Sequence, residues 1–338
     1  MKIGSLDLAK NIMYVAEIGN NHEGNFNLAK KMVEEAASAG ANAVKFQAIR
    51  AQNLVSSENI KRYEQLKSFE LTQKEFMQLA NFAKKKELFF IVTPLDLETV
   101  DFLRKIVSAF KISSGDNNFY PLLEKVAKTG KPIILSTGLA DLKQIKKSKN
   151  FIENVWKKSN IKQKIAILHC VTSYPVPDDQ ANLLAIQTLK NEFDCVVGYS
   201  DHTLGIEACV ISAVLGAKII EKHFTIDKNY SDFRDHKLSA TRSEFITMVD
   251  KINKAMIFMG NGKKQIQKSE RAIRSLVRRS ITTAQDLKAG KKICFDDLNW
   301  IRVPGGLQSG VEGKIVGKKL KVFLKKNELI LMKHLKKD

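Results

Sequence analysis

The sequence predicts a (β/α)8 TIM barrel followed by a small, mostly β domain. Eight short apolar runs, rich in β-branched residues, alternate with longer segments of helical period. Together they fill about 250 residues, which is the usual length of such a barrel. The runs are almost continuously apolar, as strands are when helices cover a parallel sheet. Beyond them, short β patterns interrupted by glycine and proline indicate the second domain.

The expected strands are the eight apolar runs. In chain order they are Tyr14–Gly19, Ala43–Gln47, Phe89–Pro94, Ala109–Gly115, Pro132–Gly138, Ile165–Val171, Val196–His202 and Ile219–Thr225. Helical patterns separate them. In the first, Leu28, Met32 and Val33 fall on one face of a helix that Gly40 ends. A doubly wound sheet is the alternative architecture, but the turn after the first run lacks a glycine-rich dinucleotide-binding motif.

The domain organisation follows from the change in pattern after the barrel. The barrel is expected to cover residues 1–262 and the second domain residues 279–338, with a polar, glycine-containing linker at about residues 259–278. A domain of about 60 residues buries little apolar surface and is marginally stable alone. We therefore expect it to pack against the barrel or against a partner subunit.

The composition excludes several classes of protein. The formal net charge is +20, but the lysines are spread along helical faces, as at Lys143–Lys149, and over the C-terminal tail. A nucleic-acid-binding protein concentrates its basic residues on one face with interleaved aromatics, so no nucleic-acid partner is expected. The sequence has no run of about 18 apolar residues and no signal-peptide pattern, so we expect a cytoplasmic protein without membrane contact.

The cysteines are expected to be reduced core thiols. Cys170, Cys195 and Cys209 lie in apolar strand or helix patterns, and Cys294 lies apart from them. Their spacing is not that of a metal site. A reduced state agrees with a cytoplasmic location.

Polar residues gather at the C-terminal ends of the expected strands or directly after them. They are Glu17, Lys45, Gln47, Thr93, Lys111, Ser114, Ser136, Thr172, Ser200, His202 and His223. In a barrel these ends converge on one face, where enzymes of this fold have their active sites. Lys45 and Lys111 suit a carboxylate or phosphate, and the hydroxyls suit a small anion. For each serine, a helix N-cap is the structural alternative.

Two histidines predict a metal site. His202 and His223 end strands seven and eight, which are neighbours in a closed barrel. Two imidazoles there can bind one divalent ion while leaving positions open for water and substrate. Glu17, on the adjacent first strand, is placed to orient a metal-bound water or to transfer a proton. His169 is expected in the core, and His22 in a loop near the site.

The motifs in these positions are those of a known family. They are AEIGNNHEG (16–24), VKFQ (44–47), KISSGD (111–116), LSTG (135–138), YSDHT (199–203) and EKHFT (221–225). With these motifs in order, the chain resembles the sialic acid synthase family, which includes N-acetylneuraminate, legionaminic acid and pseudaminic acid synthases. The C-terminal segment is similar to the family's SAF (antifreeze-like) domain. The resemblance implies metal-dependent condensation of phosphoenolpyruvate with an open-chain N-acyl amino sugar, giving a nonulosonic acid and phosphate.

The resemblance also implies roles for individual residues. The catalytic residues would be Glu17, His202 and His223, with the two histidines holding Mn²⁺ or Mg²⁺. Phosphoenolpyruvate would be bound by Lys45, Thr93, Lys111, Ser114, Ser136, Thr172, Tyr174 and Ser200. The sugar would be bound by Gln47, Asp116, Asp235 and Arg302. The family forms a homodimer in which the SAF domain of one subunit caps the partner's barrel.

Four departures from the family's pattern leave the sugar open. Thr172 replaces an asparagine, and Asp116 a longer glutamate. The loop at 229–240 is one residue longer, with Asp235 matching the family's sugar-binding aspartate. Val303 stands in place of an arginine; Arg302 is adjacent to it, but neighbouring residues of a β segment face opposite sides. The acceptor is thus N-acetylmannosamine, a 2,4-diacylamino-6-deoxy hexose or another modified hexose.

Two other functions remain as alternatives. One is a barrel aldolase in which Lys45, Lys111 or Lys222 forms a Schiff base. The other is a basic scaffold that binds nucleic acid or polysaccharide without catalysis. Trapping with borohydride would identify the first, and salt-dependent DNA binding without phosphate release would identify the second.

Overall fold

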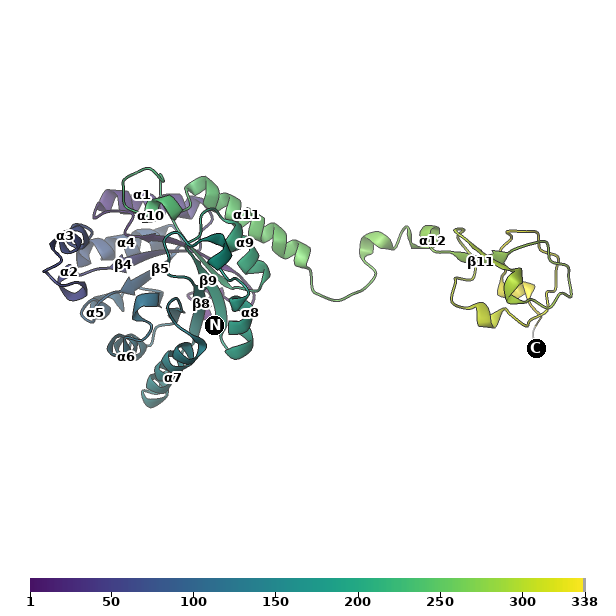
Figure 1. Cartoon of the computed structure of the whole chain (residues 1–338), viewed down its shortest axis with the longest axis horizontal. Coiled ribbons are helices and arrows are strands. Elements are labelled where there is room, and N and C mark those ends of the chain that lie inside the picture. The colour runs from purple at the N-terminus through teal and green to yellow at the C-terminus, as the bar shows by residue number, and fades with distance from the viewer. Residues whose placement is uncertain (337–338) are drawn as a thin grey trace. The chain divides into compact units, whose positions relative to one another are not determined.

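The computed structural model describes residues 1–336. The chain divides into two compact units, Met1–Gly260 and the residues from Asn261 onward, which are considered separately (Figure 1). In the described part of the chain, no helix is long and apolar enough to cross a membrane.

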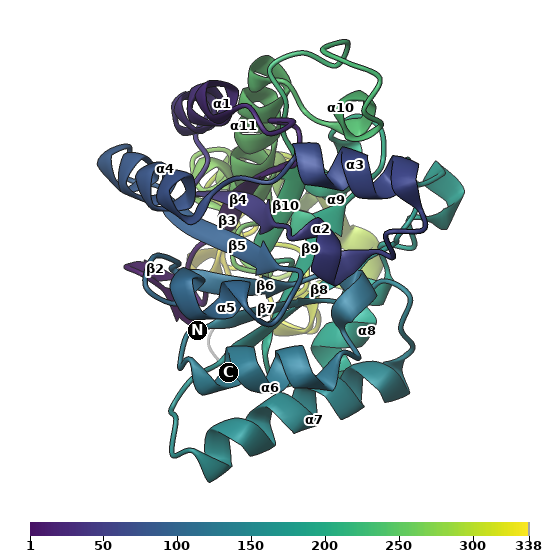
Figure 2. The same cartoon turned by 90° about the vertical axis from the view of Figure 1, so that its left-hand side faces the viewer.

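The first unit is a closed barrel of parallel strands, which confirms the predicted fold class (Figure 2). The strands are β3 (Met13–Gly19), β4 (Ala43–Ala48), β5 (Phe89–Pro94), β6 (Ala109–Ile112), β7 (Ile133–Ser136), β8 (Ile165–Cys170), β9 (Val196–Asp201) and β10 (Ile219–His223). They neighbour one another in chain order, and β10 pairs with β3 to close the ring. In that pairing His223 lies opposite Glu17.

Helices surround the strands of the first unit. They are α1 (Phe26–Ser38), α2 (Ala51–Leu54), α3 (Ile60–Ser68), α4 (Gln73–Lys85), α5 (Thr99–Leu103), α6 (Tyr120–Lys128), α7 (Leu142–Lys158), α8 (Ala185–Glu192), α9 (Glu207–Val214), α10 (Asp235–Leu238) and α11 (Arg242–Met259). α1 begins after Asn25, whose side chain accepts from the Leu28 N–H, and ends before Gly40 at φ +83°. α2 and α3 are an insertion between β4 and α4 that the periodicity did not predict.

Several strands end earlier than expected. β6 ends at Ile112 rather than Gly115, and β7 at Ser136 rather than Gly138. The residues after β6 turn into a short 3-10 helix, Ser114–Asp116. The Gly138 N–H donates to the Ser114 hydroxyl, 3.1 Å away, instead of to a neighbouring strand. The sheet therefore ends where the polar side chains begin, at the mouth of the barrel.

Inward-facing positions of the strands change from apolar to polar along the barrel. The deep layer is a buried apolar cluster that includes Val15, Ala43, Ile91 and Ile219. Because side chains alternate between the two sides of a strand, the next inward position is two residues on. Glu17, Lys45, Thr93 and Glu221 occupy these positions and are buried. The polar site thus rests on an apolar floor.

An N-terminal hairpin joins this apolar floor. It is formed by β1 (Lys2–Ile3) and β2 (Leu6–Asp7), which pair antiparallel. Ile3 and Leu8 have no exposed surface and pack in the deep layer. Full burial of such a side chain contributes roughly 1.5–3 kcal/mol. The hairpin was not expected from the sequence, because its strands are only two residues long.

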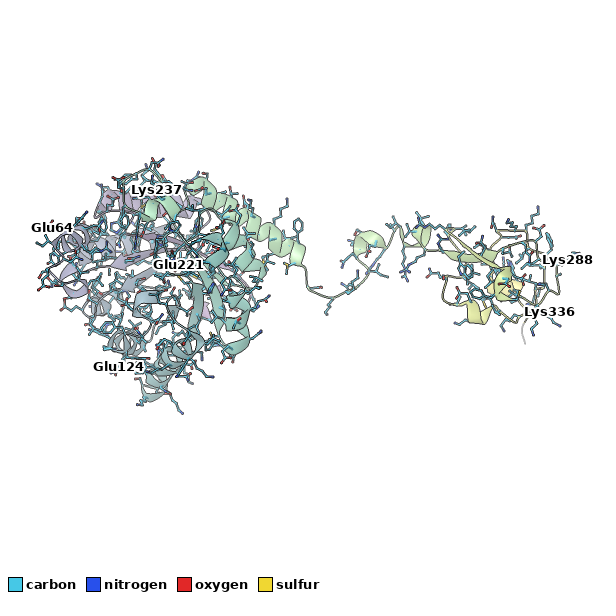
Figure 3. All side chains as sticks on the ribbon, viewed as in Figure 1. Glu64, Glu124, Glu221, Lys237, Lys288 and Lys336 are labelled. Carbon is cyan, nitrogen blue, oxygen red and sulfur yellow. The ribbon has the colours of Figure 1, made fainter. Side chains whose placement is uncertain are left out.

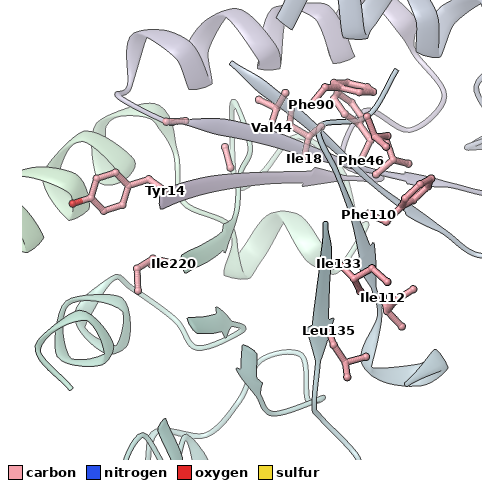
Figure 4. Close-up of a cluster of buried hydrophobic side chains, with 14 of the residues drawn as sticks. Tyr14, Ile18, Val44, Phe46, Phe90, Phe110, Ile112, Ile133, Leu135 and Ile220 are labelled. Atoms are coloured by element: carbon pink, nitrogen blue, oxygen red, sulfur yellow. The ribbon is translucent and has the colours of Figure 1, made fainter. Parts of the chain in front are cut away.

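Outward-facing positions form the larger core between strands and helices. Tyr14, Val44, Phe46, Phe90 and Phe110 belong to this buried cluster (Figure 4). Hydrophobic residues therefore occupy both the inward-facing and the outward-facing positions of the strands, which is why the strands appear in the sequence as continuous apolar runs.

One outward-facing pair is charged. Lys222 Nζ lies 2.8 Å from Asp201 Oδ2 and also donates to the Thr203 carbonyl at 2.6 Å. Cys209 of α9 donates to the same carboxylate oxygen at 3.3 Å. Lys222 therefore lies in the barrel wall beneath α9, on the opposite side of β10 from the site, which removes it as a Schiff-base candidate.

The second unit has limited regular structure. α12 (Arg274–Val277) precedes an antiparallel pair, β11 (Ser280–Thr283) and β12 (Leu298–Ile301). Isolated bridges such as Thr282–Leu329 extend the β character. Its own buried apolar cluster is formed by Ile281, Leu287, Ile293, Leu298, Ile315, Leu320, Leu324, Ile330 and Leu335.

Candidate active site

The mouth of the barrel collects almost all of the predicted site residues. Those buried in the first unit are Glu17, Lys45, Thr93, Lys111, Ser136, Ser200, His202, His223 and Asp235. Gln47, Ser114, Asp116, Thr172 and Tyr174 are half-buried. Arg302 alone belongs to the second unit, where it is exposed directly after β12.

A buried ion-pair network lies at the centre of the site. Lys45 Nζ is 2.7 Å from Glu17 Oε1 and 3.5 Å from Glu221 Oε1, and Lys111 Nζ is 2.9 Å from Glu221 Oε1. Ser200 donates to the same Glu221 oxygen at 2.8 Å. Glu221 thus joins both lysines from inside the barrel. Its place in the first unit is labelled in Figure 3.

Sequence reasoning missed Glu221. It lies in the EKHFT motif (221–225), beside the Schiff-base candidate Lys222 and two residues before the predicted metal ligand His223. The signal was present, because Ile219, Glu221 and His223 share one side of β10 by the alternation of strand side chains.

The network shifts the pKa of each member. Burial raises the pKa of Glu221, but Lys111 and Lys45 outweigh it and hold this pKa at about 2. Burial raises the pKa of Glu17 above its usual value despite Lys45. Burial lowers the pKa of Lys111, and the charge of Lys45 adds to this effect. Glu221 is therefore the fixed counter-charge, and Glu17 is the carboxyl group better suited to exchanging a proton.

Hydroxyl groups lie on the other side of the mouth. In the part of the chain that the structure describes, Ser136 Oγ and Thr172 Oγ1 are buried without a hydrogen-bond partner. A Cβ added to Gly138 would lie 2.2 Å from Thr172 Oγ1 and 2.8 Å from Ser114 Oγ, so only glycine fits between them. Unpaired buried hydroxyls cost free energy, and they suit the oxygens of a bound anion.

The two histidines lie close together at the mouth of the barrel. His202 Nδ1 lies 2.9 Å from the Val171 carbonyl, which places the proton on Nδ1 and leaves the Nε2 lone pair available. The His202 and His223 ring centroids are 5.3 Å apart. Burial, reinforced by the positive charges of His202 and Lys45, holds the pKa of His223 well below its usual value. A neutral imidazole is the form that binds metals.

The remaining ligands to such an ion would not all come from side chains. Within residues 1–336, no group of three histidine, cysteine, aspartate or glutamate side chains has metal-site geometry. His223 Nδ1 and Glu17 Oε2 are buried without partners among these residues. The two histidines therefore fit an open site, in which water and substrate complete the coordination.

Tyr174 connects the histidines to the outer part of the mouth. Its ring centroid is 4.2 Å from that of His202 and 6.1 Å from that of His223. On the opposite side of the mouth, Gln47 donates to Glu17 Oε1 at 3.0 Å. Asp116 accepts from Ser113 at 2.6 Å, and burial raises its pKa.

Other residues differ in part from expectation. His169 is buried, as expected, and its Nε2 contacts the Ala181 carbonyl at 2.9 Å. His22 packs against Phe46 on the outer side of the barrel wall, with 5.9 Å between ring centroids, so it does not face the site. Cys170 was expected only in the core, but its Sγ lies 3.8 Å from His202 Nδ1. The four cysteines are unpaired.

Comparison with known proteins identifies the family. The NeuB family matches residues 32–264, and the SAF domain matches residues 278–336. An uncharacterized protein of Methanocaldococcus jannaschii is 44% identical, covering 98% of this chain and 97% of its own. The N,N'-diacetyllegionaminic acid synthase of Campylobacter jejuni is 39% identical, covering 95% of this chain and 99% of its own.

A solved structure agrees with this assignment. The N-acetylneuraminic acid (sialic acid) synthetase of Leptospira borgpetersenii, determined in complex with citrate, is 36% identical and superposes with a TM-score of 0.75. The match covers 80% of this chain and 94% of that one. The chain therefore belongs to the NeuB family, the sialic acid synthase family that its motifs indicated, and it carries a SAF domain.

Proposed function

We propose that this protein condenses phosphoenolpyruvate with an open-chain N-acyl amino sugar, releasing phosphate and forming a sialic-acid-like nonulosonic acid. The observation that carries the proposal is the buried pair Lys45 and Lys111 facing unpaired hydroxyls, directly beside the two histidines. This arrangement suits a small anion with two charged groups next to a divalent ion. The named relatives supply the class of sugar.

The reaction joins three molecules in this mouth. C3 of phosphoenolpyruvate attacks the aldehyde carbon of the sugar, a water oxygen adds to C2, and phosphate leaves with cleavage of its C–O bond. Mn²⁺ or Mg²⁺, held by His202 and His223, would supply Lewis-acid polarisation of the aldehyde. Lys45 and Lys111 hold the anionic groups, and Ser136 and Thr172 donate to their oxygens.

Glu17 is the residue we assign to proton transfer. Its raised pKa and its unpaired Oε2 allow it to take the proton of the attacking water and to give a proton to the oxygen of the former aldehyde, which becomes a hydroxyl. Gln47 keeps the carboxyl group oriented through its 3.0 Å bond to Oε1.

The two lysines are expected to serve phosphoenolpyruvate rather than the sugar. Replacing either Lys45 or Lys111 with methionine should raise the KM for phosphoenolpyruvate roughly tenfold to hundredfold, because a charge-assisted contact contributes about 1.5–3 kcal/mol. Initial rates at varied phosphoenolpyruvate and saturating sugar measure this. Lys143→Met, at the exposed start of α7, is the control. An increase in the KM for the sugar instead would reverse the assignment of the two pockets.

The acceptor is expected to be a 2,4-diacylamino-6-deoxy hexose rather than N-acetylmannosamine. Two relatives are N,N'-diacetyllegionaminic acid synthases at 39% and 36% identity. Thr172 and Asp116 are short side chains, which leaves room for a second acyl group. A sugar that makes one hydrogen bond fewer with the site than the preferred sugar loses about 1–3 kcal/mol, or roughly tenfold to hundredfold in kcat/KM.

A panel of sugars tests both the function and the acceptor. Phosphate release from phosphoenolpyruvate is measured with each sugar at saturating Mn²⁺, and kcat/KM values are compared. A preference of about tenfold or more for N-acetylmannosamine would show that the substituted positions do not select the sugar. No release with any amino sugar would contradict the proposed function. Retention of a borohydride-trapped adduct would favour the Schiff-base aldolase instead.

The assembly and location complete the proposal. We propose a cytoplasmic homodimer in which the SAF domain of one subunit covers the partner's barrel and brings Arg302 to the sugar. The small apolar cluster of the second unit supports this proposal, because a domain with a core of this size is only marginally stable unless it packs against a partner.

A further inference from the structure

The loop after β10 carries an arginine that sequence reasoning did not assign to the site. Arg234 lies within the segment 229–240, immediately before Asp235. Its guanidinium carbon is 4.6 Å from the centre of the Tyr174 ring, and Tyr174 in turn packs on His202 at 4.2 Å. Arg234 therefore lies at the mouth of the barrel, one ring away from the histidines.

The backbone around Arg234 is anchored on both sides. Before it, Phe233 packs edge-on against Phe69, with 5.0 Å between ring centroids. After it, the buried His236 lies between Thr225 Oγ1, at 2.7 Å, and Glu23 Oε1, at 3.0 Å. A binding group is most effective when its position is set before the ligand arrives. These contacts supply that preorganisation.

A second set of bonds holds the backbone of Asp235. Ser239 donates to the Asp235 carbonyl at 2.6 Å, and Asn21 donates to the Ser239 hydroxyl at 2.9 Å. Asn21 also donates to the Phe224 carbonyl at 2.9 Å, which ties the loop to the strand that carries His223. The Arg234–Asp235 pair is therefore held in register with the histidine site.

The side chain of Arg234 has donors to spare. Its Nε donates to Asp235 Oδ1 at 3.3 Å. For the residues that the structure describes, neither Nη nitrogen has a hydrogen-bond partner, and the side chain is 64% exposed. A guanidinium carries five N–H donors in a planar fork. Most of these donors remain available to a ligand in the mouth.

The chemistry of the pair selects its ligand. Arg234 offers N–H donors, and the adjacent Asp235 carboxylate offers acceptor positions. An amide matches both, because its carbonyl accepts and its N–H donates. A second phosphate matches less well, since Asp235 already balances the charge of Arg234. We infer that Arg234 and Asp235 together recognise an N-acyl group of the acceptor sugar and that Arg234 determines specificity for it.

This inference rests on the proposed function and is tested within it. Arg234→Met keeps the unbranched stem of the side chain and removes the guanidinium with its donors; because the residue is exposed, the variant is expected to fold. It should raise the KM for the 2,4-diacetamido-6-deoxy hexose roughly tenfold to hundredfold while leaving the KM for phosphoenolpyruvate unchanged. The KM of Arg234→Lys for this sugar should lie between those of the wild type and of Arg234→Met, because lysine keeps the charge but loses the planar fork.

Sugar analogues show whether the acyl group is the contact. The probes are the same hexose with the acylamino group at C2, or that at C4, replaced by hydroxyl. With the analogue that lacks the recognised group, Arg234→Met should change KM by less than about twofold, since there is nothing left to lose. The control is Lys237→Met, an exposed cation of the same loop that hydrogen-bonds Asn229 (Figure 3).

The outcomes separate this inference from the proposed function. An equal rise in KM for the diacylated sugar and both analogues would show that Arg234 only supports the loop, and would overturn the inference. A change confined to kcat or to the KM for phosphoenolpyruvate would overturn it as well. In both cases the wild-type protein would still release phosphate, so the proposed function would stand. Absence of phosphate release by the wild-type protein would overturn both.

Discussion

Replacing His223 with alanine is expected to lower kcat/KM by about a thousandfold or more. His223 is one of the two imidazoles proposed to hold the metal, and a Lewis acid contributes several kcal/mol to such a reaction. His202→Ala should have a similar effect. The metal content of each variant after desalting, measured by mass spectrometry, should fall with the activity. This second readout distinguishes a lost metal from a lost catalytic base.

Chelation gives the matching experiment on the unaltered protein. Treatment with EDTA should abolish phosphate release, and Mn²⁺ or Mg²⁺ should restore it. His334→Ala serves as the control, because this histidine lies in the second unit and its ring accepts from the Leu331 N–H of its own turn. Full activity of His223→Ala with no added metal would remove His223 from the proposed metal site.

Removing the second unit is expected to cost most of the activity while leaving a folded barrel. The residues up to Gly260 form a compact unit with its own apolar core, so a protein ending there should unfold cooperatively. Its kcat/KM should fall at least tenfold, because an uncovered site admits water and lacks the proposed Arg302 contact. Circular dichroism and phosphate release measured on the same preparation test the two parts of this expectation.

A point substitution sharpens this prediction. Arg302→Ala should raise the KM for the sugar in the full-length protein. Lys288→Ala should not, although Lys288 is also an exposed cation of the second unit. Unchanged activity in the truncated protein would show that the SAF domain does not complete the site.

The fold was predictable because its signal repeats. Each of the eight strands carries apolar residues on both sides. An error in the predicted bounds of any one strand therefore leaves the predicted fold unchanged. The inserted helices α2 and α3 and the hairpin β1–β2 were not found, because each is too short or too polar to show a period. Ile3 and Leu8 reveal their role only once the barrel supplies the floor that they complete.

The site was predictable where a residue type and a strand end coincide. His202, His223, Lys45 and Lys111 all meet that condition and converge in the structure. Glu221 meets it too, but choosing between it and Lys222 required the side-chain parity of β10. Arg234 could not be found in this way, since a loop has no period and its contact with Tyr174 joins residues 60 positions apart in sequence (234 − 174).

The closure of the ring by β10 against β3 has a consequence for how the protein is made. The paired residues Met13 and Ile219 are 206 positions apart (219 − 13). At about 5–20 residues per second, a ribosome needs on the order of 10–40 s to synthesise the chain between them. During that time the edge of β3 that pairs with β10 has no partner, and unpaired edges promote aggregation. Nascent chains of this protein should therefore depend on chaperones until β10 has left the ribosome, and fusions that delay its release should lower the soluble yield.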